Sequence, residues 1–458
     1  MRLKQFIAKD VRGYMKYDIK FRDSVTFLIG INGSGKTTVL KLLSGLLTPS
    51  YIDLCQIEYS QIELICEGMS DNSNIKIISE KEGNRLTLKY CKNGQHTVVG
   101  SFEYIEKTFN RRRFEPEFVN QEITKRNLLD FDQSQVVSKI KELKTPLFLG
   151  LNRRIVNTNG SDYFERDGFE RRRRFHLDFA LDSVDEALND IQELFYGFIR
   201  QNAKRQSFLS DSFRKKVFEE SFKAASIDTM PTIDYERELL RLQYQKEEFV
   251  KAIEKLGIKD ESIQFSDFFD RIQETLNTLS SINPENELLK DDSSDYFNAL
   301  MSWILNSSQI ERIDKIIQYS NDYSDRVAKL KEPINRFVES ANLFFNESEK
   351  TVTVYEQGDI IIKIAGAKKN NSIFELSSGE KQLLVILAHL SFHNRNQRSS
   401  IFIIDEPELS LHISWQEKFV DAILKASPNT QFIMATHAPA ILAKPERKDW
   451  CEDISIKL

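Results

Sequence analysis

The 458-residue sequence contains few cysteines and no long hydrophobic run, and both scarcities narrow the classes of protein that it can encode. The four cysteines, Cys55, Cys66, Cys91 and Cys451, lie far apart and form no C-x-x-C pair. This spacing argues against a zinc site and against a disulfide framework, and it is typical of a reducing cytoplasm. No run approaches the roughly 18 apolar residues of a transmembrane helix, and the N-terminal residues lack the apolar core of a signal peptide. We therefore expect a cytoplasmic protein with no membrane partner.

An excess of positive charge is also lacking. The sequence has 64 lysines and arginines against 69 aspartates and glutamates, a net charge of −5, so a nucleic acid would need a local basic patch. The densest basic runs are RRR at 111–113 and RRRR at 171–174. They fit a patch for DNA phosphates or for an acidic phage protein, but a solvated face or a set of interface salt bridges is the commoner origin of such runs. Nothing in them indicates base stacking or sequence-specific readout.

The order of the expected elements divides the chain into three segments. Residues 1–155 begin with strands, a glycine-rich loop and a helix, and from residue 52 they continue as short strands separated by turns. Residues 156–350 are mostly helical, with a short heptad-like arm over 235–256. Residues 351–458 begin with a hairpin and then alternate helix and strand. We therefore predict an α/β head made of an N-terminal and a C-terminal lobe, with an antiparallel β subdomain and a large helical insertion.

The most specific motif is GINGSGKT, from Gly30 to Thr37, which matches G-x-x-x-x-G-K-[ST] between an apolar strand and a helix. Glycines in such a loop let backbone N–H groups surround an anion at the N-terminus of the helix. Lys36 is expected to reach the β and γ phosphates of ATP, and the hydroxyl of Thr37 to bind Mg²⁺. The residues expected to contact the nucleotide here are Asn32, Gly33, Ser34, Gly35, Lys36, Thr37 and Thr38.

The apolar strand IFIID at 401–405 ends in one carboxylate, Asp405, and a second, Glu406, follows directly. Because the carboxyl ends of parallel strands form the ligand edge of a sheet, Asp405 is expected to hold Mg²⁺ and Glu406 to polarise the attacking water. His437 follows the next apolar strand. A lone histidine is more often structural, but at this place we predict a contact with the γ-phosphate. Glu406, His437 and Lys36 are thus the catalytic candidates.

A second anion-binding segment is expected where ELSSGEKQ, from residue 375, opens an apolar helix. A helix N-terminus carries partial positive charge and free N–H groups, although a plain N-cap is the alternative. Since the first loop already surrounds its own nucleotide, this helix start is best used against the nucleotide of a second copy. That arrangement requires at least a head-to-tail dimer. The residues expected to contact nucleotide here are Ser377, Ser378, Gly379 and Glu380.

Together these motifs resemble those of ABC-type ATPases. LSSGE at 376–380 is similar to the signature motif, and SLH at 410–412 is similar to the D-loop. The order of phosphate loop, signature, Walker B strand, D-loop and switch histidine is the family's order. The resemblance implies that Ser377 and Gly379 contact the γ-phosphate in trans and that Glu406 is the catalytic base. Where the family carries its glutamine loop, either Asn152 or Arg153 could stand in, and the choice stays open. Gln56 and Gln61 lie earlier in the chain and fit that place less well.

The signature itself departs from the family pattern at two positions. Ser378 stands where glycine is usual, and Glu380 stands where glutamine is usual. Both changes also occur in branches of the family that are not transporters.

The spacing and the residues of the motifs resemble those of the branch that contains RecF, Rad50-like heads and OLD-like ATPases. A gap of 340 residues separates Thr37 from Ser377, which argues against the compact energy subunit of a transporter. The long coiled coil and C-x-x-C hook of Rad50-like proteins are missing. Because 21 residues follow His437 in this sequence, we do not expect the Toprim nuclease of OLD proteins, and His176 has no H-N-H partners. What remains resembles stand-alone ATPase subunits of two-gene anti-phage systems such as Septu and PARIS.

That resemblance implies an ATP-dependent sensor or scaffold that assembles as an oligomer and holds a separate effector, with a nuclease the expected kind. DNA and a phage protein are both open as triggers. The main alternative is a repair or recombination ATPase that acts directly on DNA. A scaffold that binds ATP with hardly any turnover is a further alternative, although Asp405, Glu406 and His437 are all present.

Overall fold

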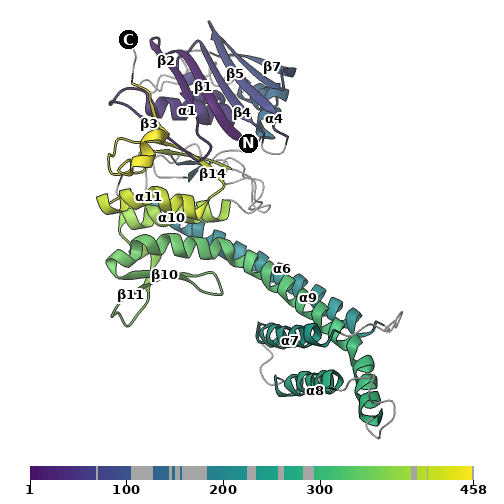
Figure 1. The fold of residues 1–458 in the computed structure, drawn as a ribbon. Coiled ribbons are helices and arrows are strands. Elements are labelled where there is room, and N and C mark those ends of the chain that lie inside the picture. The colour runs from purple at the N-terminus through teal and green to yellow at the C-terminus, as the bar shows by residue number, and fades with distance from the viewer. Residues whose placement is uncertain are drawn as a thin grey trace. The chain divides into compact units, whose positions relative to one another are not determined.

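The computed structural model describes residues 1–68, 71–104, 127–143, 147–149, 155–156, 183–223, 234–255, 262–281, 293–393, 400–409 and 411–455. The chain forms two compact units (Figure 1). Unit 1 comprises Met1–Tyr196 and Pro333–Leu458, and unit 2 comprises Gly197–Glu332. The division falls inside two long helices that begin or end in unit 1. The segment bounds expected at residues 155 and 350 stay a prediction.

The sheet at the centre of unit 1 has six strands in the order β15-β3-β14-β13-β8-β9. Its parallel strands are β3 (Val25–Ile29), β8 (Leu147–Leu149), β13 (Ser400–Asp405), β14 (Thr430–Ala435) and β15 (Cys451–Asp453). Only β9 (Ile155–Val156) runs antiparallel to its neighbour. A parallel sheet is covered on both faces, so its central strands are apolar along their whole length. The apolar runs of β3, β13 and β14 fit this position. Helix α1 (Lys36–Leu47) packs on β13 and β14.

A second six-stranded sheet is wholly antiparallel, in the order β2-β1-β4-β5-β6-β7. Its strands are β1 (Arg2–Val11), β2 (Met15–Lys20), β4 (Gln61–Glu67), β5 (Asn74–Glu82), β6 (Arg85–Lys92) and β7 (Gln95–Glu103). Alternate residues of β2, β4 and β6 are buried, and they share one core with α1 and with α4 (Gln135–Lys141). The expected β subdomain is confirmed. The start that we predicted for it, at residue 52, is wrong, because residues 51–56 form helix α2. The N-cap of this helix, Ser50, accepts a hydrogen bond from the N–H of Asp53.

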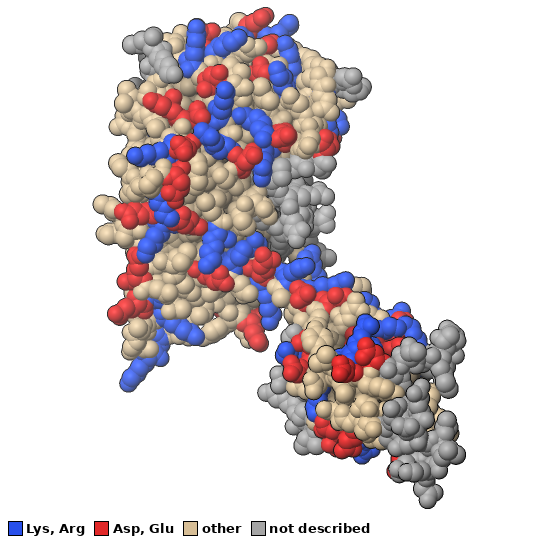
Figure 2. Space-filling view, in the orientation of Figure 1, with Lys and Arg blue, Asp and Glu red and all other residues tan. Residues whose placement is uncertain are grey.

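The C-terminal part of unit 1 begins with the expected hairpin. Strands β10 (Lys350–Val354) and β11 (Ile360–Ile364) pair antiparallel, and β12 (Asn371–Ser372) joins them. Helices α10 (Ser378–His393) and α11 (Ile413–Ala426) follow and pack on each other. Figure 2 shows Lys and Arg side chains interspersed with Asp and Glu over one face of unit 1, so the described residues of that face form no large field of one sign.

Unit 2 is helical, as the sequence predicts. It contains the end of α6 (Ser183–Ser221), α7 (Tyr235–Lys255), α8 (Ser262–Ser281) and most of α9 (Ser293–Phe345). Helices α7, α8 and α9 share an apolar core that includes Leu242, Phe269 and Trp303. Lys246, which interrupts the heptad pattern, forms an ion pair with Asp270 of α8 at 2.6 Å. No helix among the described residues is both long and apolar enough to span a membrane.

Candidate active site

The loop from Gly30 to Thr37 connects β3 to the N-terminus of α1, as its sequence predicts. Gly33 and Gly35 have φ angles of 86° and 88°, a region that favours glycine. Gly35 is further constrained, because a Cβ there would lie 2.0 Å from the hydroxyl oxygen of Tyr17. Helix α1 has neither a side-chain cap nor an acidic residue in its first turn. Its free N–H groups are therefore available to an anion.

Lys36 lies against this loop and is only 6% exposed. Its Nζ donates to the carbonyl oxygens of Gly30 (2.9 Å) and Ile31 (3.2 Å). Burial lowers the pKa of Lys36, although the nearby carboxylates of Glu406 and Asp405 work in the opposite direction. An entering phosphate offers the ammonium a charged partner in place of two neutral carbonyls, which is the stronger kind of hydrogen bond.

Tyr17 of β2 holds the loop from the antiparallel sheet. Its hydroxyl donates to the backbone carbonyl of Ser34 at 2.8 Å, and it also lies 2.8 Å from the sulfur of Met15. Burial raises the pKa of Tyr17 to about 12, so the side chain remains a neutral donor at physiological pH. Sequence reasoning missed this residue. The alternation of apolar and polar residues in β2 could have indicated only that its side chain faces inward.

Asp405 ends β13, beside β14, and is 4% exposed. Burial raises the pKa of Asp405, while the hydrogen bond from Thr37 lowers it. The structure thus brings together the two residues predicted to bind Mg²⁺. Asp405 Oδ1 and Ser34 Oγ are buried without a hydrogen-bond partner among the described residues. Buried polar atoms are rarely left unsatisfied, and a carboxylate with a hydroxyl is a hard-oxygen donor set that suits Mg²⁺.

Glu406 follows with a φ angle of 51°, which is uncommon for a residue other than glycine. Its backbone N–H donates to the carbonyl of Ala435 at 2.9 Å. This contact holds the turn against the end of β14. A strained backbone of this kind at a sheet edge is typical of functional sites.

Glu408 connects the two loops that leave β13 and β14. Its Oε1 accepts from the backbone N–H of His437 at 2.7 Å, and its Oε2 accepts from the hydroxyl of Thr436 at 2.9 Å. The His437 side chain itself is exposed. Sequence reasoning assigned no role to Glu408, although it is the third acidic residue of DEPE. Its two contacts fix the loop that carries His437.

The signature segment begins α10 as a capping box. Ser377 N and Oγ each lie 2.9 Å from Glu380 Oε2, and Glu380 N donates to Ser377 Oγ at 3.4 Å. Glu380 Oε1 accepts from Lys350 of β10 at 2.7 Å. Burial alone raises the pKa of Glu380, but the hydrogen bonds from Lys350 and Ser377 outweigh burial and lower it. Glu380, which stands where glutamine is usual in this motif, therefore forms an ion pair with Lys350. A neutral glutamine could not form that ion pair.

Ser377 and Ser378 are exposed at this helix start, whereas Gly379 and Glu380 are buried. Among the described residues, the contacts of Ser377 and Glu380 remain within β10 and α10, and none reaches the loop from Gly30 to Thr37. Several predicted residues lie outside the described part of the chain. They are Ser410 of the D-loop, Asn152, Arg153, His176 and the basic runs at 111–113 and 171–174.

A mixed α/β sheet with a phosphate-loop motif before α1, Asp405 on a central strand and a signature-like helix start defines an ABC-type P-loop ATPase head. The chain belongs to the AAA ATPase domain family, whose family model matches residues 1–442. The predicted fold class is confirmed, as is the resemblance to ABC-type ATPases.

Curated relatives include two retron proteins and a chromosome partition protein. The Retron Vc95 probable ATPase of Vibrio cholerae is 25% identical over an alignment of 215 residues, and the match covers 43% of this chain and 41% of that protein. The Retron Ec83 probable ATPase of Escherichia coli is 27% identical over an alignment of 200 residues, and the match covers 39% of this chain and 36% of that protein. The chromosome partition protein Smc of Mycoplasma genitalium is 24% identical over an alignment of 210 residues, and the match covers 43% of this chain and 21% of that protein. The match thus spans about two fifths or less of each relative.

Solved Smc head domains are also similar. One from Pyrococcus furiosus, bound to the C-terminal domain of ScpA, has a TM-score of 0.37 at 13% identity and covers 96% of this chain and 91% of that chain. One from Thermotoga maritima has a TM-score of 0.36 at 13% identity, with coverages of 97% and 92%.

Proposed function

We propose that this protein binds and hydrolyses ATP with Mg²⁺, and that ATP-dependent engagement of two heads controls a separate effector in an anti-phage defence complex. The observation that carries the ATPase part is the hydrogen bond from the half-buried Thr37 to the buried Asp405 at the base of the phosphate loop. Asp405 Oδ1 has no hydrogen-bond partner among the described residues. The proposed reaction consumes ATP and water and yields ADP and phosphate.

In this proposal the phosphates bind at the N-terminus of α1. Lys36 exchanges the carbonyls of Gly30 and Ile31 for phosphate oxygens. The loop residues that we expect to surround the phosphates are Asn32, Gly33, Ser34, Gly35 and Thr38. Thr37 and Asp405 hold Mg²⁺, which neutralises charge on the phosphates when bound. Tyr17 keeps the loop in place from behind.

For the chemical step, Glu406 accepts a proton from the attacking water. Glu406 lies directly after Asp405 at the sheet edge, with a left-handed backbone. His437 contacts the γ-phosphate from the neighbouring loop. Glu408 holds that loop by accepting a hydrogen bond from the backbone N–H of His437.

The second half of the site is proposed to come from another copy. Ser377, Ser378 and Gly379 lie at an N-terminus of a long helix, and the two serines are exposed. Glu380 acts here as a positioning residue, because both of its carboxylate oxygens are already occupied. A head-to-tail dimer places these groups over the γ-phosphate of the partner.

Contacts within unit 1 support a link from the signature to the helical unit. Lys381 of α10 forms an ion pair with Asp185 of α6 at 2.8 Å. Gln192 of α6 bridges the hairpin by donating to the carbonyl of Gly358 (2.7 Å) and accepting from the N–H of Ile360 (3.3 Å). Since α6 continues into unit 2, a displacement of α10 on head engagement is transmitted along this helix.

The defence role is supported by similarity to two retron probable ATPases. An ATPase that acts directly on DNA is the second candidate, supported by similarity to Smc. Co-expression with the neighbouring gene product, followed by native mass measurement with and without ATP, distinguishes them. A stable complex with a nuclease-like protein supports the first function. A lone dimer that binds DNA only with ATP supports the second.

A further inference from the structure

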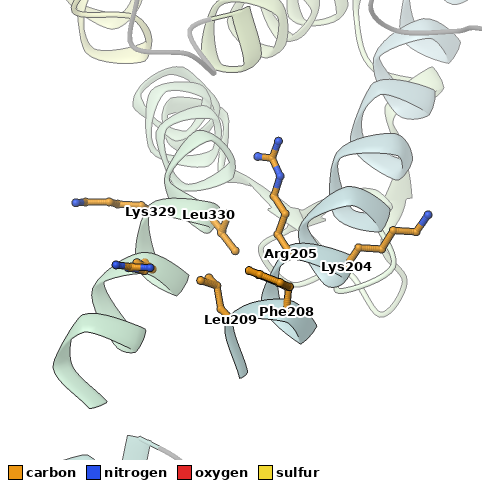
Figure 3. Close-up of a pocket in the computed structure, with 7 residues that line it drawn as sticks. Lys204, Arg205, Phe208, Leu209, Lys329 and Leu330 are labelled. Carbon is orange, nitrogen blue, oxygen red and sulfur yellow. The ribbon is translucent and has the colours of Figure 1, made fainter. Parts of the chain in front are cut away.

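Unit 2 contains a pocket of about 480 Å³ between α6 and α9 (Figure 3). Phe208 and Leu209 of α6 and Leu330 of α9 form its apolar interior. Figure 3 shows these three side chains converging on the space between the two helices. Phe208 remains 74% exposed, so most of a large apolar side chain faces solvent. Concave sites lined by apolar and aromatic side chains are the usual form of a binding site.

The two helices that form the pocket are fixed on both sides of it. On one side, Asn202 Nδ2 donates to the carbonyl of Leu330 at 2.7 Å. On the other side, the rings of Phe213 and Tyr323 stack with centroids 5.5 Å apart. The pocket is therefore a preformed feature of the α6–α9 pair, which reduces the entropic cost of binding.

Four cations line the same pocket: Lys204 and Arg205 of α6, and Arg326 and Lys329 of α9. None of the described residues that line it is acidic. Within the described part of the chain none of the four forms an ion pair, whereas Lys315 of α9, outside the pocket, pairs with Glu220 at 3.0 Å. In Figure 3 the charged ends of Lys204 and Lys329 extend outward on either side of the apolar interior. The pocket thus combines an apolar centre with a rim of one charge.

We propose that this pocket docks an acidic polypeptide segment of a partner protein, with one aromatic or leucine side chain inserted between Phe208, Leu209 and Leu330. The four cations then pair with carboxylates that flank this anchor. An apolar anchor in a pocket surrounded by charge complementarity is a common arrangement of a binding hot spot. The proposal concerns unit 2 alone and does not depend on ATP hydrolysis.

The residues that line the pocket favour a polypeptide over single-stranded nucleic acid and over a small molecule. Single-stranded nucleic acid is usually bound by a series of aromatic platforms, whereas here one phenylalanine lies beside two leucines. Small molecules are usually oriented by polar groups inside the pocket, whereas the polar groups here are the long cations that line it.

Fluorescence anisotropy on the full chain tests the proposal. The probe is a labelled peptide with one phenylalanine between runs of glutamate. Control peptides replace the phenylalanine by alanine, or the glutamates by lysines. We expect the first peptide to bind and both controls to bind at least about tenfold more weakly, which corresponds to about 1.4 kcal/mol.

Protein variants then locate the binding. Phe208→Ala and Arg205→Glu are each expected to weaken the peptide about tenfold. Lys215→Glu makes the same charge change on α6 outside the pocket, where the side chain is 77% exposed, and should leave the affinity unchanged. Helical content by circular dichroism confirms that each variant is folded. Absence of peptide binding, equal loss in Lys215→Glu, or displacement of the peptide by a poly-thymidine strand that binds more tightly would each overturn the proposal.

Discussion

Glu408 Oε1 lies 2.7 Å from the backbone nitrogen of His437, so a carboxylate from one sheet-edge loop holds the loop of the next strand. The same carboxylate accepts from the hydroxyl of Thr436 through Oε2. This relationship joins the loop with the proposed catalytic base to the loop with the proposed γ-phosphate contact.

Replacing Glu408 therefore tests whether the position of His437 matters for turnover. Glu408→Ala removes both acceptors, and we expect kcat to fall about tenfold or more while KM for ATP changes little, as for a loss restricted to the transition state. Glu408→Gln keeps one carbonyl oxygen and should recover part of the rate. Steady-state ATPase kinetics measure both variants. Equal kcat in Glu408→Ala and the parent would contradict the positioning role.

Tyr17→Phe removes the hydroxyl that supports the phosphate loop at Ser34. Because the carbonyl of Ser34 loses its donor in a buried place, we expect a loss of about 1 kcal/mol in the free energy of unfolding. We also expect ATP affinity to weaken severalfold. Denaturant unfolding and nucleotide titration measure the two effects. Tyr14→Phe, on an exposed ring, is the matched control and should change neither.

Asp405→Asn separates two effects of the buried carboxylate: its effect on the stability of the free protein and its effect on the binding of Mg·ATP. Asp405 is 4% exposed and its Oδ1 lacks a partner among the described residues, so in the absence of nucleotide the variant should be as stable as the parent or more stable. With Mg²⁺ and ATP the order should reverse, because ligand that binds only the folded parent stabilises it by about 2.7 kcal/mol at one hundred times Kd. Thermal unfolding with and without Mg·ATP tests this. An equal ligand-dependent shift of Tm in both proteins would remove Asp405 from the site.

The ion pair between Glu380 and Lys350 predicts a pH dependence. The pKa of Glu380 is lowered in the fold, so its charged form stabilises the protein above the ordinary glutamate pKa, and this contribution is lost as pH falls through the lowered value. Glu380→Gln should be less stable than the parent by about 1.5–3 kcal/mol at neutral pH, the size of a hydrogen bond to a charged group. The difference should shrink below about pH 4, near the ordinary pKa of glutamate. A difference that stays constant from pH 7 to pH 3.5 would show that the charge of Glu380 is not the cause.

The sequence predicted those parts of the site that depend on local order. The run from β3 through the phosphate loop to α1, the hairpin of β10 and β11, and the position of Asp405 at a strand end all follow from residues close together in the chain. Contacts between distant residues were not predicted. Tyr17 and Ser34, Glu408 and His437, and Lys350 and Glu380 meet only through sheet pairing and helix packing, which hydrophobic periodicity does not specify.

In the proposed mechanism two heads close over ATP, and Glu406 then activates water. The most direct test measures ATP hydrolysis and native mass together for Glu406→Gln, with Lys36→Ala as the variant that should not bind nucleotide. We expect Glu406→Gln to lose about 10²–10⁴ in rate, the usual contribution of a general base, and to accumulate as an ATP-bound dimer. Lys36→Ala should show neither ATP-bound dimer nor turnover. Hydrolysis by Glu406→Gln at the parent rate, with the same mass in the presence and absence of ATP, would contradict the account.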